Sequence, residues 1–275
     1  MDILFFLEKP LSKYVVIRGR VKYNKSISTR DGKIMNEFSR LFLNIESGAT
    51  VILEKDKVYD VRQDDSFYEE GYFCSNTAKK HENPNGYRNA AIFLKDKKNI
   101  VIDGNGATLL VHGKMTPMLF DNCENVTVRN LEVDYACPTM SEFTVVAKNG
   151  ESCDIRINDD CLFRIEGNEL IWQGECGGDG KPYWEGGSHA DRRHVKLFDP
   201  AIGQTRDFDR NDMTFRKIEV IGKNLLRLYP ENTQADFVVG CVYQTRNIVR
   251  DQTGSMFQRC RNLRFENLRV KFMHG

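Results

Sequence analysis

An asparagine-centred segment that occurs three times along the chain most constrains the fold. Residues 120–135 align without gaps on residues 257–272, and the two copies share Phe, Cys, both Asn, Leu and Val at matched positions. A shorter and weaker copy begins at Asn99. Self-similarity of this kind is typical of solenoids, in which each repeat is one coil that buries its apolar residues against its neighbours. We therefore predict an all-β chain built as a parallel β-helix.

The pattern inside each copy supports this prediction. Val126 and Val128 alternate as the inward residues of a strand, and the alternate apolar residues of 131–135 continue the pattern after a bend at Asn130. Asn tolerates the left-handed backbone of such a bend, and stacked Asn side chains can hydrogen-bond from coil to coil. Gly104 takes the same place in the first copy. The alternative is two unrelated strand pairs that share Asn by chance.

An amphipathic helix precedes the first copy. Apolar residues fall at helical spacing over 34–45, Asp31 can cap the start, and Gly48 follows the end. Residues 49–59 then alternate as a strand, a turn and a second strand. Because the open end of a solenoid is an unpaired sheet edge, we expect this helix to cover the first coil.

The second and third copies are separated by far more than one coil, which indicates an inserted segment. Asn149-Gly150 lies between two strands and is a strong hairpin signal, and Gly167-Asn168 divides a second strand pair. Further strands are expected at 195–198, 215–220, 225–229 and 238–243. We predict that the insert forms a small antiparallel β-barrel or sandwich.

The expected domain organisation has four parts. They are an N-terminal extension of unknown role (1–30), the first part of the β-helix with its capping helix (31–136), the inserted domain (137–235) and a return to the β-helix (236–275). The chain stops directly after the third copy without a polar capping segment, so we expect an N-terminal fragment of a longer solenoid.

Charge and composition narrow the partners. Lys plus Arg total 40 against 39 Asp plus Glu, a net charge of +1, which implies neither a nucleic acid nor an anionic membrane as partner. The N-terminus lacks the features of a signal peptide and no later run approaches transmembrane length, so the chain as given is expected in the cytoplasm, with secretion if a leader precedes it. The eight cysteines form no C-x-x-C pair and are expected as mostly buried thiols. Oligomeric state is not indicated.

Two groups of motifs resemble known proteins. Residues 48–53 and 99–106 resemble the opening of pectate-lyase-like β-helix proteins. Residues 111–117 and 133–142, with the β-rich insert that leads to Gly240, are similar to the α-1,3-galactosidases of glycoside hydrolase family 110. This similarity covers most of the chain after about residue 31.

The resemblance implies a right-handed β-helix with inserted β-barrel domains and a galactose-terminated glycan as substrate. Such enzymes are inverting exo-glycosidases that remove terminal α-linked galactose with two carboxyl groups and no obligatory metal or other cofactor. The two groups lie roughly 6.5 to 9.5 Å apart, which leaves room for a water. The resemblance places the catalytic pair on coils later than those present here, so no catalytic residue is carried over.

Two carboxylates in this chain are nevertheless candidates for a catalytic role. Asp134 points outward from a coil beside the place where the insert departs, and the outer face of a solenoid is where substrates lie. Glu142 follows eight residues later and could join it at a cleft. The alternative for each is an ordinary solvated side chain.

Three further residues are candidates for sugar binding. His112 and His274 each follow a solenoid strand next to Gly and could hydrogen-bond sugar hydroxyls. Trp184, in a Gly-rich loop, is expected to be exposed and to stack on a sugar ring, whereas Trp172 is expected in the core of the insert. His189 and His194 flank Asp191 without a third ligand at suitable spacing, so no metal site is predicted.

Two other functions fit the same scaffold. A polysaccharide lyase or polygalacturonase would need basic residues, and often calcium, to neutralise uronates. A non-catalytic glycan-binding solenoid would need neither carboxylate. The neutral charge balance argues mildly against the first of these alternatives.

Overall fold

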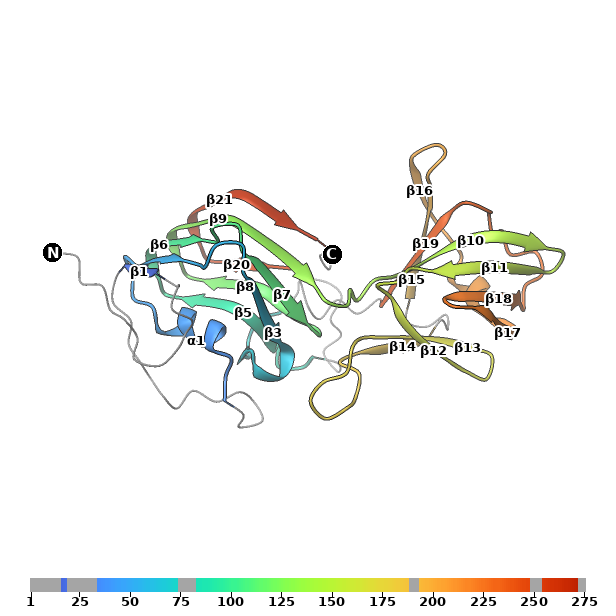
Figure 1. Ribbon diagram of the computed structural model, residues 1–275, viewed down its shortest axis with the longest axis horizontal. Helices are drawn as coiled ribbons and strands as arrows, with labels where there is room; N and C mark the ends of the chain where they lie inside the picture. The colour runs from blue at the N-terminus through green and yellow to red at the C-terminus, as the bar shows by residue number, and fades with distance from the viewer. Residues whose placement is uncertain (1–15, 19–33, 74–82, 188–192, 248–253, 272–275) are drawn as a thin grey trace. The chain divides into compact units, whose positions relative to one another are not determined.

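The computed structural model describes residues 16–18, 34–73, 83–187, 193–247 and 254–271. These residues are mostly in β-strands, and the helices among them are α1 (Glu37–Asn44) and the short 3-10 helices η1 (Gln63–Asp65) and η2 (Arg210–Met213). The chain divides into two compact units, Met1–Ala136 with Asp251–Gly275 and Cys137–Arg250 (Figure 1). None of the helices in the described part is long and apolar enough to cross a membrane.

Parallel strands dominate the first unit. Its strands are β1 (Val16–Arg18), β2 (Thr50–Ile52), β3 (Val58–Arg62), β4 (Phe67–Glu69), β5 (Arg88–Lys95), β6 (Lys98–Asp103), β7 (Thr108–His112), β8 (Thr116–Asp121), β9 (Glu124–Tyr135), β20 (Met256–Gln258) and β21 (Arg261–Val270). β9 is flanked by β6 and β21 along its first half and by β7 and β21 along its second half. A separate parallel ladder joins β5, β8 and β20. The three copies found in the sequence therefore lie side by side in register (Figure 1).

The side chains of matched asparagines stack and hydrogen-bond between these strands, as predicted. Asn99, Asn125 and Asn262 all have left-handed backbone, with φ of 57°, 55° and 53°. Asn125 Nδ2 donates to Asn99 Oδ1, and Asn262 Nδ2 donates to Asn125 Oδ1, both at 2.9 Å. A second ladder forms at the bend inside β9 and β21, where Asn267 Nδ2 donates to Asn130 Oδ1 at 2.9 Å. Each ladder satisfies polar groups at a bend that only a few residue types adopt without strain.

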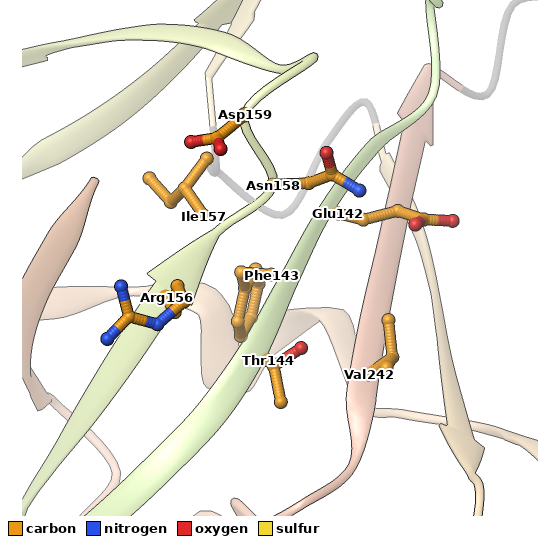
Figure 2. Close-up of a pocket in the computed structure, with 8 residues that line it drawn as sticks. All are labelled: Glu142, Phe143, Thr144, Arg156, Ile157, Asn158, Asp159 and Val242. Carbon is orange, nitrogen blue, oxygen red and sulfur yellow. The ribbon is translucent and has the colours of Figure 1, made fainter.

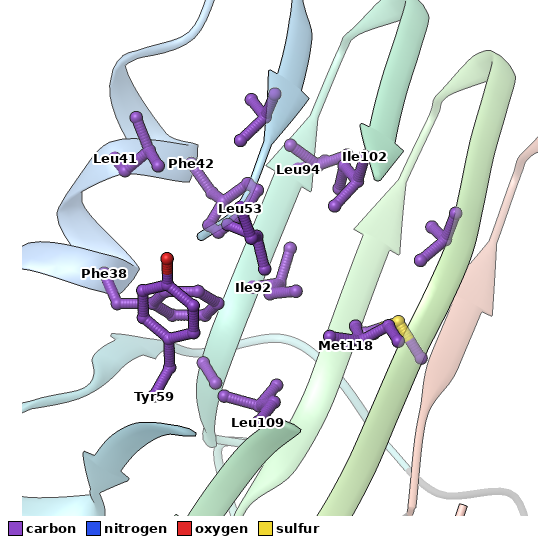
Figure 3. Close-up of a cluster of buried hydrophobic side chains, with 14 of the residues drawn as sticks. Phe38, Leu41, Phe42, Leu53, Tyr59, Ile92, Leu94, Ile102, Leu109 and Met118 are labelled. Carbon is purple, nitrogen blue, oxygen red and sulfur yellow. The ribbon is translucent and has the colours of Figure 1, made fainter. Parts of the chain in front are cut away.

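The interior between the strands is apolar and closely filled. Every inward residue predicted in β9 is buried, with exposed fractions of 0 to 3%: Val126, Val128, Leu131, Val133 and Tyr135. Helix α1 lays Phe38, Leu41 and Phe42 over one end of this core, where they pack near Leu53 and Ile92 (Figure 3). The predicted helix therefore exists and packs on the first strands.

The start of that helix differs from the prediction. Helix α1 begins at Glu37 rather than at residue 34, because Asn36 is the N-cap and its side chain accepts a hydrogen bond from Phe38 N at 2.9 Å. Asn is as good an N-cap as Asp, and apolar spacing alone does not decide between successive caps. Ile34 lies outside the helix and is 79% exposed. Asp31, the predicted cap, lies outside the described residues.

Gly104 is required for close packing rather than for a left-handed backbone. A Cβ atom at this position would lie 2.4 Å from Asn130 O and 2.8 Å from Leu131 Cα. Gly104 N donates to Arg129 O at 2.8 Å, and the positive φ values in this bend belong to Asn105 (52°) and Gly106 (84°). The backbones of neighbouring bends approach so closely here that no side chain fits.

The second unit is antiparallel. Seven strands form one sheet in the order β16-β15-β19-β10-β11-β18-β17, and three form another in the order β12-β13-β14. The strands are β10 (Ser141–Asn149), β11 (Ser152–Ile157), β12 (Leu162–Glu166), β13 (Glu169–Gln173), β14 (Glu185–Gly187), β15 (Arg193–Asp199), β16 (Gln204–Asp207), β17 (Phe215–Gly222), β18 (Leu225–Pro230) and β19 (Val242–Asn247). Both predicted hairpins are confirmed, since β10 pairs with β11 and β12 with β13.

One core fills the space between these two sheets. Trp172 is fully buried there, as predicted, and stacks on Phe143, which stacks in turn on Tyr243. Tyr243 belongs to β19, which lies beyond residue 235 where the insert was expected to end, and β19 pairs with β10 and β15 at the centre of the seven-stranded sheet. The second unit accordingly extends to Arg250.

Candidate functional site

The outer face of β9 and β21 carries a network of charged side chains around Asp134. Lys271 Nζ lies 2.6 Å from Glu132 Oε1 and 3.5 Å from Asp134 Oδ2, and Arg269 Nη1 lies 3.3 Å from Glu132 Oε2. Asp134 Oδ1 also accepts a hydrogen bond from Tyr135 N at 2.9 Å. The outward direction predicted for Asp134 is confirmed. Its matched residue in the next copy, Lys271, is its ion-pair partner.

Glu132 is the carboxylate on this face that sequence reasoning missed. The hydrogen bond from Lys271 is the largest influence on it and lowers its pKa, with Arg269 acting in the same direction. Strand alternation was the available signal, because Glu132 precedes Asp134 by two residues and points to the same side. The pair presents two carboxylates beside one ammonium, an arrangement that can accept hydrogen bonds from hydroxyl groups.

His112 is held at the end of β7. Its Nε2 lies 3.0 Å from Asp60 Oδ2, and the residue is buried, with 8% exposed, whereas the side chain of Asp60 is half exposed. The carboxylate fixes the orientation of the ring, and of the two side chains Asp60 is the more accessible. His274, the other histidine predicted to bind sugar, lies outside the described residues.

The second unit has a pocket that includes Glu142 (Figure 2). It is a cavity of about 330 Å³ lined by Glu142, Phe143, Thr144, Arg156, Ile157, Asn158, Asp159 and Val242. These residues come from β10, β11, the turn after β11 and the start of β19. Glu142 belongs to the second unit and Asp134 to the first.

Neighbouring amides hold the carboxylates of this pocket in place. Gln244 Nε2 donates to Glu142 Oε1 at 2.8 Å, and Asn224 Nδ2 donates to Asp159 Oδ1 at 2.7 Å. The backbone also links the two walls, because Asn158 N donates to Glu142 O at 3.1 Å. A pocket with fixed, mixed polar groups can orient a small polar molecule.

Trp184 is buried, which corrects the prediction that it is exposed. It is 8% exposed and packs in the core of the second unit. Gly174 N donates to Trp184 O at 2.9 Å, and a Cβ atom at Gly174 would lie 2.5 Å from Trp184 Nε1. The chain from β13 to β14 folds back on itself through these contacts and draws the indole inside. This position does not suit stacking on a sugar.

Most of the thiols in the described regions are buried. Burial raises the pKa of Cys123 and Cys161 to about 11 and that of Cys137 and Cys153 to about 12, which keeps them protonated and poorly nucleophilic. Five of the seven described cysteines are buried, Cys176 is exposed, and none is in a disulfide. No group of three His, Cys, Asp or Glu side chains among the described residues is arranged to hold a metal ion. His189 and Asp191 lie outside those residues.

Comparison with known proteins finds no matching family model. Curated relatives do match over both units. Alpha-1,3-galactosidase A of Bacteroides fragilis is 27% identical over 266 residues, which is 95% of this chain and 40% of the relative. Alpha-1,3-galactosidase A of Akkermansia muciniphila is 32% identical over 198 residues, 70% of this chain and 30% of the relative.

A second type of relative matches a shorter stretch. Alpha-1,3-galactosidase B of Bacteroides thetaiotaomicron is 27% identical over 190 residues, 67% of this chain and 29% of the relative. The chain thus spans two fifths or less of the length of these curated relatives.

Proposed function

We propose that this chain is part of a glycoside hydrolase that removes terminal α-linked galactose from glycans by inverting hydrolysis. The observation that carries the proposal is the similarity to an alpha-1,3-galactosidase over 95% of the chain, through both units. A shared scaffold alone would leave the chemistry open, since one fold supports many activities. Similarity to relatives that share one activity in their names, through the inserted unit as well as the repeats, supports the narrower reading.

The architecture proposed for the first unit is a right-handed parallel β-helix of the pectate-lyase-like type, interrupted by the second unit. In-register parallel ladders and stacked Asn residues support this. We also propose that further coils stack over β21. Phe265 and Val270, which pair with the fully buried Val128 and Val133 of β9, are each 40% exposed. Another coil would bury them as β21 buries β9.

Inverting hydrolysis needs one carboxyl group that protonates the leaving oxygen and one carboxylate that activates water. Asp134 is the first candidate, with Glu132 beside it, and Glu142 is the candidate in the second unit. His112, linked to Asp60, is a candidate for orienting sugar hydroxyls, and His274 is proposed on sequence grounds. No cofactor is required by this chemistry.

The test is hydrolysis by the purified chain of p-nitrophenyl α-galactoside and of an α-1,3-linked galactosyl disaccharide, with polygalacturonate as comparator. We expect galactose release, and an Asp134→Asn variant should lose at least a hundredfold in kcat/KM. Glu266→Gln is the matched control. Like Asp134 of β9, Glu266 is an outward carboxylate, but it lies on β21 and pairs with Arg264. Turnover of the uronate polymer alone would reject the proposal.

The pairing of basic side chains on β21 argues against the alternative of a polysaccharide lyase or polygalacturonase, which would act on uronates. β21 and the residue after it carry the basic side chains Arg261, Arg264, Arg269 and Lys271. Arg264 is paired with Glu266, and Arg269 and Lys271 with Glu132. Most of this positive charge is neutralised by carboxylates of the protein itself. The pairing therefore favours a neutral sugar over a polyuronate as ligand.

A second candidate function is glycan binding without hydrolysis. The observation that favours it is that Lys271 and the backbone N–H of Tyr135 both hold the Asp134 carboxylate. Sugar binding measured by calorimetry, together with no galactose release from either substrate, would support this candidate over the enzyme.

A further inference from the structure

The pocket around Glu142 belongs to a polar sheet face of which the proposed hydrolysis uses only Glu142, and a binding role for this carboxylate is the alternative to that catalytic one. In the strand register, Thr144 lies between Arg156 of β11 and Val242 of β19, and Glu142 lies opposite Gln244. Side chains at alternate positions of these strands point into the core and are buried, among them Phe143, Ile157 and Tyr243. Glu142, Thr144, Arg156, Val242 and Gln244 therefore share the outer face of the seven-stranded sheet.

Several polar atoms in the cavity keep unused hydrogen-bonding capacity. Glu142 uses one carboxylate oxygen for Gln244, which leaves the other available. Asn158 uses its side-chain oxygen to accept from Asp160 N at 3.1 Å, which leaves its two amide donors. Within the described regions, the hydroxyl of Thr144 and the guanidinium of exposed Arg156 have no hydrogen-bond or ion-pair partner. The cavity thus offers both donors and acceptors.

The charge of these groups limits the class of ligand. Glu142 and Asp159 bring negative charge and Arg156 brings positive charge into one cavity. An anionic ligand would meet two carboxylates, and a cation would meet the guanidinium. A neutral molecule with many hydroxyl groups can donate to the carboxylates and accept from Arg156 and Asn158 at the same time.

An exposed aromatic ring lies on the same face beyond the cavity. Phe198 of β15 is opposite Val242 in the register of β15 and β19, so it continues the row that contains Thr144 and Arg156. It is 41% exposed, whereas its neighbour Leu197 is buried in the core. An aromatic face beside hydroxyl-binding groups can stack on the C–H side of a sugar ring.

We propose that this outer face of the second unit, formed by Glu142, Thr144, Arg156, Asn158 and Phe198, binds a neutral hexose-terminated oligosaccharide without cleaving it. The site would hold a glycan on the second unit independently of hydrolysis. It rests on the proposed function only in the choice of galactose for the probe.

The experiment is a titration of the isotope-labelled full chain with an α-1,3-linked galactosyl disaccharide, followed by backbone amide NMR. We expect saturable shifts in β10, β11 and β19. Arg156→Ala and Phe198→Ala should each weaken binding about tenfold, because each removes one direct contact. Arg156→Lys should restore part of the affinity. Ile202→Ala is the matched control, since Ile202 is 63% exposed in the turn after β15 and lies away from the cavity.

Three results would overturn the proposal: an absence of shifts in these strands, unchanged affinity in both variants, or tighter binding here of a digalacturonate than of the neutral sugar. Far-UV circular dichroism of each variant establishes that it is folded. Hydrolysis measured on the same samples separates the two proposals. Binding without hydrolysis would contradict only the proposed enzyme activity. Hydrolysis without binding at this face would contradict only the proposed glycan site.

Discussion

Replacing Gly104 by Ala is a direct perturbation of the close packing between the neighbouring bends at Gly104 and Asn130. The new Cβ atom would lie 2.4 Å from Asn130 O, about 1 Å inside an ordinary contact, and 2.8 Å from both Cα and Cβ of Leu131. Relief requires the two backbones to separate, which strains the hydrogen bonds from Gly104 N to Arg129 O and from Gly106 N to Asn130 O.

The expected cost follows from these contacts. Overpacking costs about 1 to 3 kcal/mol, and the two weakened hydrogen bonds about 1 kcal/mol each. Ala also lowers the conformational entropy of the unfolded chain, which stabilises the folded protein by about 0.4 to 1 kcal/mol and offsets part of this cost. The free energy of unfolding of the first unit should therefore fall by about 2 to 5 kcal/mol.

The two units can be followed separately in urea. Both tryptophans of the chain, Trp172 and Trp184, belong to the second unit, so tryptophan fluorescence reports that unit while far-UV circular dichroism reports both. We expect Gly104→Ala to shift the dichroism transition and to leave the fluorescence transition in place. Gly222→Ala is the matched control, since its nearest neighbour would be 3.4 Å away. A Gly104→Ala chain that unfolds like the unmodified protein would refute the packing argument.

Three further predictions concern single side chains. Asp121 is 1% exposed and accepts hydrogen bonds from Arg259 and Tyr72, which lower its pKa although burial alone would raise it. This stabilisation should be complete above about pH 4 and lost as the pH falls through the lowered pKa, so Asp121→Asn should cost about 2 kcal/mol at pH 7 and flatten the acid limb of a stability curve. Trp184→Ala should cost about 3 to 5 kcal/mol in urea denaturation, because the indole is in the core, whereas an exposed sugar platform would lose affinity with little change in stability. Gly150→Ala should cost about 1 kcal/mol, because its φ of 58° disfavours a side chain even though no atom lies within 4 Å, and an unchanged unfolding midpoint would contradict this.

The repeat was readable in the sequence because Asn and alternating apolar residues impose the same local geometry in each copy. Asn130 and Asn267 have the predicted left-handed backbone, with φ of 52° and 49°, and the predicted side-chain ladder. Gly104 shows what spacing does not reveal. Gly104 aligns with Asn130, but it is needed because no side chain fits at this position. The left-handed backbone begins one residue later, at Asn105.

The candidate site was less readable, because its properties depend on contacts between distant segments. The burial of Trp184 follows from pairing between β13 and β14, which a Gly-rich loop does not signal. The partner of Glu142, Gln244, is 102 residues away in the chain. Asp134 was predicted to face outward and does, but its ion pair with Lys271 depends on the register of β9 and β21.

The stereochemistry of galactose release tests the proposed function most directly. Proton NMR of an α-1,3-linked galactosyl disaccharide, recorded in the first minutes after addition of the protein, distinguishes the two anomers of free galactose before they equilibrate. Inverting hydrolysis of an α-linkage predicts that β-galactose appears first. Early release of α-galactose would contradict the inverting mechanism, and an unchanged disaccharide beside turnover of polygalacturonate would contradict the galactosidase itself.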